Sequence, residues 1–254
     1  MKNLPNNRAE RRPYWPEERA ISDVLGYILI FSLITSSIAI VYTGGYGALV
    51  DVRNAERLNN AERAFDVLDT NIEDMTHRGA PSRATEIKLA GASIGFGDSV
   101  TFNVSLGPKN YTRTTLSPIV FSIGEGNSLV YSNGAIIRDQ KSGSVLLDPP
   151  AFQIGSPTVI TLVETRAHGS GISGSGRVLV RTVAASREVT RYPGVEGNIS
   201  INVTTTRTGA WKRYLEEKTD ETNGNCEVIG HTVSCQFTTS SVYLQVVKVD
   251  VFII

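Results

Sequence analysis

The chain has 254 residues, with 25 Lys and Arg residues against 25 Asp and Glu residues, so its formal net charge is zero. A neutral balance argues against a general nucleic-acid-binding protein. The length allows one or two domains. About 175 residues follow the N-terminal helical region described next, and that is enough to build a buried core.

The most apolar part of the chain is the run Ile21–Thr43, which is 23 residues long and carries one charge, Asp23. A bilayer core of about 30 Å is crossed by roughly 20 apolar helical residues. The run therefore predicts a transmembrane helix over residues 21–43, in a protein that crosses the cell membrane once.

Charge is unevenly distributed around this run. Residues 1–20 hold five Lys or Arg and three Glu, whereas the remainder carries a net charge of −2. Basic residues collect on the cytoplasmic side of membrane helices. We therefore expect residues 1–20 to be a cytoplasmic segment and the large C-terminal domain to be extracellular.

The junction between the charged segment and the apolar run has a recognisable sequence, Arg19-Ala-Ile-Ser-Asp-Val-Leu-Gly26. It resembles the processing site of archaeal type IV pilins and pilin-like proteins, and the leader is similar to haloarchaeal ones, although the mature part lacks a strongly acidic balance. The resemblance implies that a prepilin-type peptidase removes residues 1–20 by cutting between Ala20 and Ile21, next to Arg19. Many archaeal pilins have Pro where this chain has Asp23. The alternative is an uncleaved signal anchor.

Two positions early in the apolar run are interpreted as assembly residues, Asp23 and Gly26. A charge close to the bilayer is costly. Asp23 is either an interfacial carboxylate favoured by the helix dipole or a partner for the new ammonium group of Ile21 after cleavage. The second role is similar to that of the early Glu in bacterial pilins.

A second helical pattern, over residues 44–79, follows the apolar run. Apolar residues recur every three or four positions, which is typical of one face of a helix; they are Ala48, Val52, Ala55, Leu58, Ala61, Phe65, Leu68, Ile72 and Met75. This stalk predicts a stripe that packs on the protein's own β domain, with an intersubunit coiled coil as the alternative. The charged residues on its other faces, Asp69 among them, are expected to be solvated.

The helix is expected to run from Ile21 to about Met75, over roughly 80 Å. Gly44, Gly45 and Gly47 predict a bend or a soft joint where it leaves the membrane. Gly79-Ala-Pro81 predicts its end.

Residues 80–254 change to short alternating apolar runs separated by Gly, Pro, Asn and Ser, which is typical of an antiparallel sandwich. The expected strands are Thr85–Leu89, Ser99–Leu106, Ile119–Ile123, Ser128–Tyr131, Ala135–Arg138, Ser144–Leu147, Thr158–Glu164, Arg177–Ala184, Asn198–Thr206, Cys226–Ile229, Thr232–Phe237 and Val242–Ile253. Asn133-Gly134 predicts a two-residue hairpin, and Gly209–Lys218 predicts one short helix. The fold class is therefore α+β: a long N-terminal helix, transmembrane and then amphipathic, followed by an extracellular antiparallel β-sandwich.

Two kinds of modification are suggested in this domain. Cys226 and Cys235 flank Gly230-His231, so they either close a hairpin as a disulfide, which an oxidising compartment favours, or are two buried thiols. N-x-Ser/Thr triplets, the acceptor pattern for glycosylation, begin at Asn103, Asn110, Asn198 and Asn202.

Catalytic and metal-binding patterns are weak. His77, His168 and His231 lack metal-ligand spacing, and no G-x-S-x-G elbow occurs in the sequence. The run Gly169–Gly176 lacks the ending of a phosphate loop and is interpreted as a flexible loop. We expect no metal, no cofactor and no enzymatic activity.

The sequence thus predicts a pilin-like structural subunit, or minor component, of an archaeal surface filament or of its assembly machinery. Its expected partners are the membrane, the prepilin-type peptidase and like or related subunits through the apolar helix, and not nucleic acid. The alternative is a membrane-anchored extracellular β domain that binds a ligand or a surface without polymerising, and an exported hydrolase is a third reading.

Overall fold

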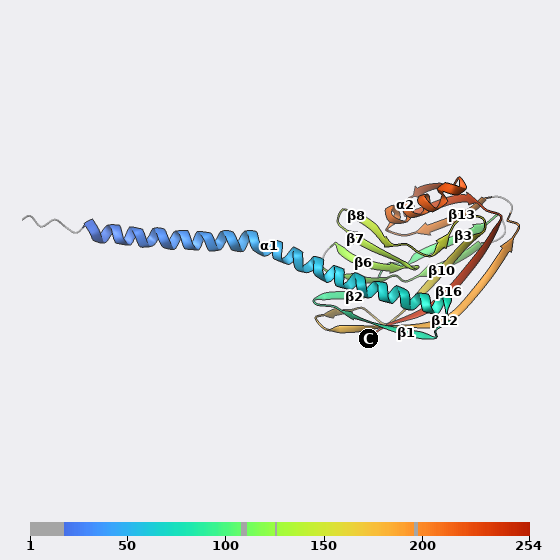
Figure 1. The fold of residues 1–254 in the computed structure, drawn as a ribbon, viewed down its shortest axis with the longest axis horizontal. Coiled ribbons are helices and arrows are strands. Elements are labelled where there is room, and N and C mark those ends of the chain that lie inside the picture. Colours follow the sequence, from blue (N-terminus) through green and yellow to red (C-terminus); the bar gives the residue numbers. More distant parts are fainter. Residues whose placement is uncertain (1–17, 108–110, 125, 196–197) are drawn as a thin grey trace, which may run out of the picture. The chain divides into compact units, whose positions relative to one another are not determined.

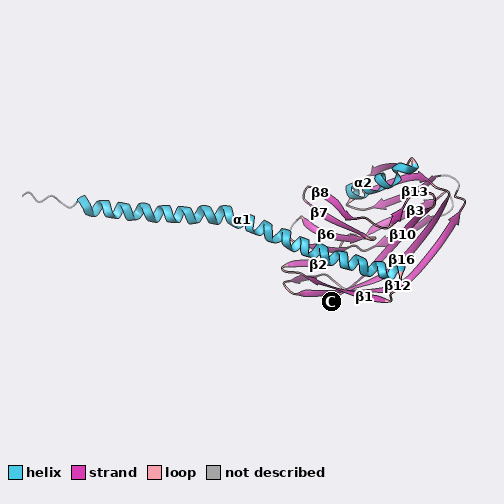
Figure 2. Cartoon of the chain, viewed as in Figure 1, coloured by secondary structure: helices cyan, strands magenta, loops and turns pink. Residues whose placement is uncertain are grey.

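The computed structural model describes residues 18–107, 111–124, 126–195 and 198–254, and the side chains of these residues from Val24 onward except that of Tyr111. The chain divides into two units, one up to Arg53 and one from Asn54 to Ile254. Figure 1 shows the elements along the chain and Figure 2 their secondary structure. The two units are described separately.

The first element is the α-helix α1, Glu18–His77. Helical structure continues without interruption through Gly44, Gly45 and Gly47. The helix ends where the sequence predicts, because Gly79 adopts a φ of +73° that residues with a Cβ rarely take. The amide N–H groups of Arg78 and Ala80 both donate to the carbonyl oxygen of Asp74, at 3.0 and 3.2 Å, and so close the helix end.

In the described residues, the remainder of the second unit forms three β-sheets and two short helices, with the following bounds. The first sheet has the order β1 (Ser82–Lys88), β12 (Arg177–Pro193), β16 (Ser241–Ile253), β10 (Thr158–His168), β9 (Phe152–Gln153). The second has the order β11 (Ile172–Gly174), β2 (Ala92–Phe96), β5 (Ile119–Ser122), β6 (Asn127–Ser132), β7 (Ala135–Gln140), β8 (Gly143–Asp148). The third has the order β14 (Asn225–Ile229), β15 (Thr232–Thr238), β13 (Asn198–Thr204), β3 (Val100–Leu106), β4 (Tyr111–Leu116), and the helices are α2 (Thr208–Thr219) and the 3₁₀ turn η1 (Asp220–Thr222).

The predicted α+β class with a sandwich-like β region is confirmed, but its pairing is not entirely antiparallel. Strands β10 and β16 run parallel, with Thr158 opposite Val242. Strand β10 is buried on both faces over Ile160–Val163, as expected for a strand covered on two sides. The central pair of the first sheet therefore joins segments that lie far apart in the sequence.

Two hydrophobic cores form within the second unit, and β16 contributes to both. Val247, Val249 and Val251 belong to the core beneath α1. Val242 and Leu244, at the other end of the same strand, belong to the core that α2 and the third sheet share. The predicted helix Gly209–Lys218 is confirmed as α2, whose Trp211 is fully buried in this second core.

The Asn133-Gly134 hairpin is also confirmed. It joins β6 to β7, and φ is +56° at Asn133 and +76° at Gly134, as a type I′ turn requires. The Asn133 side chain has a further role, since its Oδ1 accepts a hydrogen bond of 2.7 Å from the Val163 amide. The turn thereby connects the second sheet to β10.

Four of the described strands are not predicted by the sequence pattern, namely β2, β4, β9 and β11. The interpretation of Gly169–Gly176 as a flexible loop is wrong in part, because Ile172–Gly174 forms β11 and pairs with β2. A Cβ on Gly171 would come within 2.8 Å of the Ile94 carbonyl oxygen. The glycine therefore permits a close approach between two backbones, and such an approach leaves no periodic signal in the sequence.

Candidate functional site: the two halves of the long helix and the outer faces of the β domain

The apolar half of α1 exposes its side chains. Between Val24 and Val52 the large exposed apolar side chains are 46% to 73% accessible. By length and composition, the helix could cross a membrane. Exposed apolar patches beyond a few hundred Å² mark interaction sites for proteins or membranes, so this segment is the main candidate functional surface of the chain.

Three hydroxyl groups within the apolar half donate hydrogen bonds to its own backbone. Thr35 donates to the Phe31 carbonyl at 2.7 Å, Ser37 to the Leu33 carbonyl at 2.8 Å, and Thr43 to the Ala39 carbonyl at 2.8 Å. These three hydroxyls need no partner from another helix, so association of this segment would rest on close packing.

The residues assigned to processing and assembly lie at the start of this half. Arg19, Ala20 and Ile21 fall within the first turns of α1, but their side chains and that of Asp23 lie outside the described part. A Cβ built on Gly26 meets no atom within 4 Å. The chain itself therefore sets no steric demand for glycine at this position.

The amphipathic half of α1 behaves differently. Its stripe is buried from Leu58 onward, with Phe65, Leu68 and Ile72 at most 1% exposed. Phe65 meets Phe121 of β5 edge to face, with ring centroids 6.5 Å apart. The predicted packing of the stripe on the protein's own sheets holds for this part, whereas Ala48, Val52 and Ala55 are exposed.

Polar contacts fix this half on the sheets at several points. The Asn71 amide donates to the Thr85 hydroxyl at 2.9 Å, and the Gln245 amide donates to the Thr76 carbonyl at 3.0 Å. Arg138 of β7 pairs with Glu62. The expectation that the charged faces are solvated is therefore wrong at two places, because Glu62 is ion-paired and Asp69 is only 8% exposed.

The glycosylation triplets that the structure describes share one face of the third sheet. Asn202 lies opposite Asn103 across β13 and β3. Side chains two apart in a strand point the same way, so Asn198 at the start of β13 is on this face too, and it is the exposed one of the three. Asn110 lies outside the described residues.

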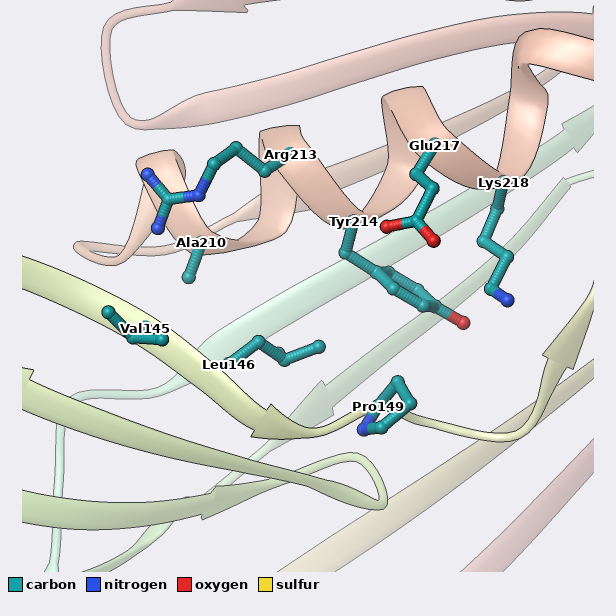
Figure 3. A pocket seen from close by; sticks show the side chains of 8 residues that line it. All are labelled: Val145, Leu146, Pro149, Ala210, Arg213, Tyr214, Glu217 and Lys218. Carbon is teal, nitrogen blue, oxygen red and sulfur yellow. The ribbon is translucent and has the colours of Figure 1, made fainter.

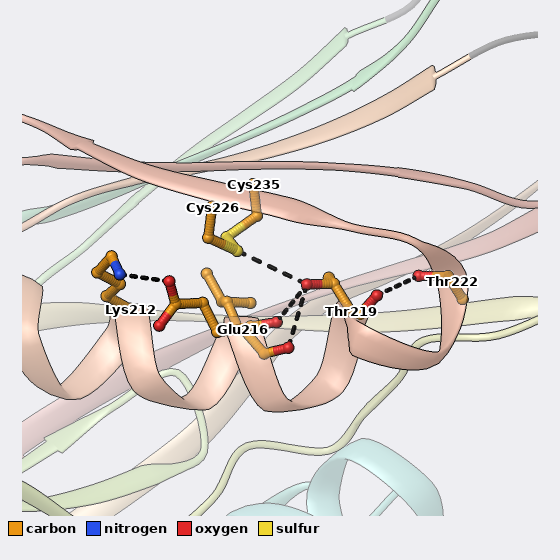
Figure 4. The surroundings of a disulfide bond; sticks show 7 residues. Lys212, Glu216, Thr219, Thr222, Cys226 and Cys235 are labelled. Carbon is orange, nitrogen blue, oxygen red and sulfur yellow. Dashed lines mark hydrogen bonds and ion pairs between the residues drawn. A yellow bond between two sulfur atoms is a disulfide. The ribbon is translucent and has the colours of Figure 1, made fainter.

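Cys226 and Cys235 lie opposite each other on β14 and β15 and form a disulfide, with an S–S distance of 1.98 Å. Figure 4 shows that the bond lies beside the C-terminal turn of α2, where the Thr219 hydroxyl is 3.6 Å from the Cys226 sulfur. The disulfide thus attaches an edge strand to the third sheet.

A groove of about 350 Å³ lies between α2 and β8. As Figure 3 shows, Val145, Leu146 and Pro149 line it on one side, and Arg213, Tyr214 and Lys218 of α2 on the other. The Tyr214 hydroxyl donates to the Pro150 carbonyl at 2.9 Å. The groove is an open, mixed surface without a cluster of reactive groups among its described lining residues.

The three histidines lie apart from one another, at the end of α1, at the end of β10 and in the β14–β15 turn. His168 stacks on Phe252 and lies 2.8 Å from the Asp250 carboxylate. This hydrogen bond is the main cause that lowers the pKa of Asp250. Within the described residues, no group of three or more His, Cys, Asp or Glu is arranged to hold a metal ion.

Together, these observations define a class of protein in which a helix that could cross a membrane continues into a helical segment that packs on a β domain. Residues 19–252 match the model of the family of unknown function DUF7289, and the chain belongs to that family. It is also similar to an uncharacterized protein of Archaeoglobus fulgidus, with 29% identity over 100 residues. That alignment covers 39% of this chain and 32% of the relative. No solved structure matches the chain.

Proposed function

We propose that the protein is a pilin-like structural subunit, or minor component, of an archaeal type IV pilus-like surface filament or of its assembly machinery. The observation that carries the proposal is the exposed apolar half of α1, joined in one helix to a half whose stripe the β domain buries. The Arg19–Gly26 sequence and the similarity to a protein of Archaeoglobus fulgidus give it further support.

In this proposal a prepilin-type peptidase on the membrane removes residues 1–20, and Ile21 becomes the N-terminus. The apolar helices of several copies then pack side by side, and van der Waals contact and release of lipid favour the assembly. The β domain is displayed outside the cell, and the protein has no enzymatic activity. Asp23 neutralises the new ammonium group of Ile21, either within a subunit or between neighbours.

To test this proposal, the N-terminal residue and the intact mass are measured on the protein from membranes and from material sheared off the cell surface. The expected result is a chain that begins at Ile21 and is present in sheared fibres. A chain that begins at Met1 and stays in the membrane fraction would contradict it.

The second candidate function is a membrane-anchored domain that binds a ligand or a surface. The groove between α2 and β8 is the observation in its favour, because its volume lies in the range of small-molecule sites. Under this reading the apolar half of α1 is only an anchor, and the protein does not leave the membrane when cells are sheared.

A further inference from the structure

A small cavity lies inside the packed part of the second unit, between α1 and the strands beneath it. Its volume is about 20 Å³, and it is lined by Asp69 of α1, Tyr131 of β6, Asn133 of the β6–β7 turn and Val163 of β10, among others. A cavity of this size has room for one water molecule.

Three polar side chains around the cavity are almost completely buried, whereas Glu73 and His77 at its edge are exposed. Asp69 is 8% exposed, Tyr131 is fully buried and Asn133 is 1% exposed. Within the described chain, the Tyr131 hydroxyl and the Asn133 Nδ2 have no hydrogen-bond partner. Both groups are donors, and a carboxyl group lies across the same small space. Buried donors are normally hydrogen-bonded, so we expect these two groups to donate to the oxygens of the Asp69 carboxyl group.

The charges that face Asp69 are all negative. They come from Asp66 and Glu73 on α1 and from Asp148 at the end of β8. The described residues that line the cavity include no Lys or Arg. They do include His77, which lies at the end of α1. The cation of Arg138 is already engaged by Glu62. An ionised Asp69 would therefore be a buried charge without a cation, which is unfavourable.

Burial, with Glu73 and Asp148 as the next causes, raises the pKa of Asp69 from 3.8 to about 7. Burial and the charge of Asp69 also raise the pKa of Tyr131 well above its ordinary value. Tyr131 thus keeps its proton at neutral pH, whereas the raised pKa of Asp69 lets this carboxyl group change its protonation there.

We propose that Asp69 is a proton-operated latch that holds the amphipathic half of α1 on the β domain. With the carboxyl group protonated, Asp69 places no charge in the cavity, and the helix stays packed on the sheets. When the proton leaves, a charge remains in a cavity that offers it two donors and no cation, and this half of the helix loosens from the sheets.

The direction of the pH dependence follows from linkage. The carboxyl group binds its proton more tightly when α1 is docked than when it is released and solvated. Between the ordinary value of 3.8 and the raised value of about 7, the docked form holds one proton more than the released form. The equilibrium constant for release therefore rises about tenfold per pH unit within this window and levels off above it.

The test is hydrogen exchange on the full-length protein in detergent micelles, read as opening constants for the backbone amides of residues 62–76 between pH 4.5 and 8.5. The ratio of the wild-type opening constant to that of Asp69→Asn should rise by more than a hundredfold up to about pH 7 and then stay constant. Glu56→Gln, at an exposed position of the same helix, serves as the matched control and should keep the wild-type pH profile. A wild-type to Asp69→Asn ratio that stays constant across the range would overturn the proposal.

A second variant keeps the test decisive if Asp69→Asn does not fold. Tyr131→Phe removes a buried hydroxyl that would otherwise donate to the carboxylate, so the pH at which the wild-type profile levels off should move upward. An unchanged levelling pH would show that the cavity groups do not act on Asp69, and the latch would be rejected.

Discussion

The two halves of α1 are similar in secondary structure and opposite in environment. From Val24 to Val52 the large apolar side chains are at least 46% exposed, except that of Val50, which is half-buried. From Leu58 to Met75, in contrast, the side chains of the stripe are at most 6% exposed. The β domain supplies the apolar face that buries the stripe from Leu58 to Met75. Burying one large apolar side chain stabilises a fold by about 1.5–3 kcal/mol. Removing the side chains of the exposed half from water would therefore be favourable by a similar amount per residue.

The largest expected effect concerns the exposed half. A valine at Gly26 has open space around it within the chain, so Gly26→Val should leave the folding of the β domain unchanged. If the apolar helices pack closely in a filament, the branched side chain keeps them apart, and sheared fibre material should fall at least about tenfold.

The measurement for Gly26→Val is the yield of sheared material by quantitative blotting, with thermal unfolding of the β domain as the internal control. Normal fibre yield would show that the exposed half is not packed closely at this position.

In the docked half, the largest expected effect is on stability. Phe65 is fully buried and contacts Phe121, so Phe65→Ala should lower the free energy of unfolding by about 3–5 kcal/mol. Val52→Ala, at a site 57% exposed, should change it by less than about 0.5 kcal/mol. Urea unfolding of the micelle-bound protein measures both, and equal losses would contradict the contrast between the halves.

A smaller effect is expected from adding volume rather than removing it. Ala61 is 2% exposed beneath the helix, whereas Ala55 is exposed. Ala61→Leu should therefore destabilise the protein by about 1–3 kcal/mol through overpacking. Ala55→Leu is its matched control and should be neutral, and destabilisation by Ala55→Leu would place the boundary between the halves before residue 55.

The smallest effect is expected at the ion pair that ties the docked half to β7. The side chains of Arg138 and Glu62 are 25% and 30% exposed, so solvent screens the pair and Glu62→Gln should cost at most about 1 kcal/mol. Glu56→Gln should cost nothing measurable. The comparison uses the same urea titration, and an equal cost for the two variants would mean that the pair contributes nothing to docking.

The parts of the fold that the sequence predicts depend on local chemistry. The periodic stripe, the helix end at Gly79 and the Asn133-Gly134 turn each rest on residues close together in the chain. Alternating apolar residues likewise place strands such as β3 and β13. These elements are confirmed because the same physical rule acts in the sequence and in the fold.

The remaining features depend on contacts between distant segments. Val52 and Phe65 belong to one stripe with one spacing, and the spacing alone does not say that Phe65 is the one buried against the sheets. The parallel pairing of β10 with β16 and the pairing of β11 with β2 have no local signal either. The helical pattern predicts a solvated face for Asp69, and it contains no sign of the cavity that Asp69 lines together with Tyr131 and Asn133.

The central claim is that the exposed half of α1 is covered by other copies of the chain, and cysteine cross-linking in native membranes and sheared material tests it most directly. Cys226 and Cys235 are bonded to each other, so a single introduced cysteine provides the reactive thiol. Leu33→Cys, at a site 70% exposed, should give a disulfide-linked dimer on mild oxidation. Leu68→Cys, at a fully buried site, should give none. A Leu33→Cys protein that stays monomeric in both fractions would contradict the account.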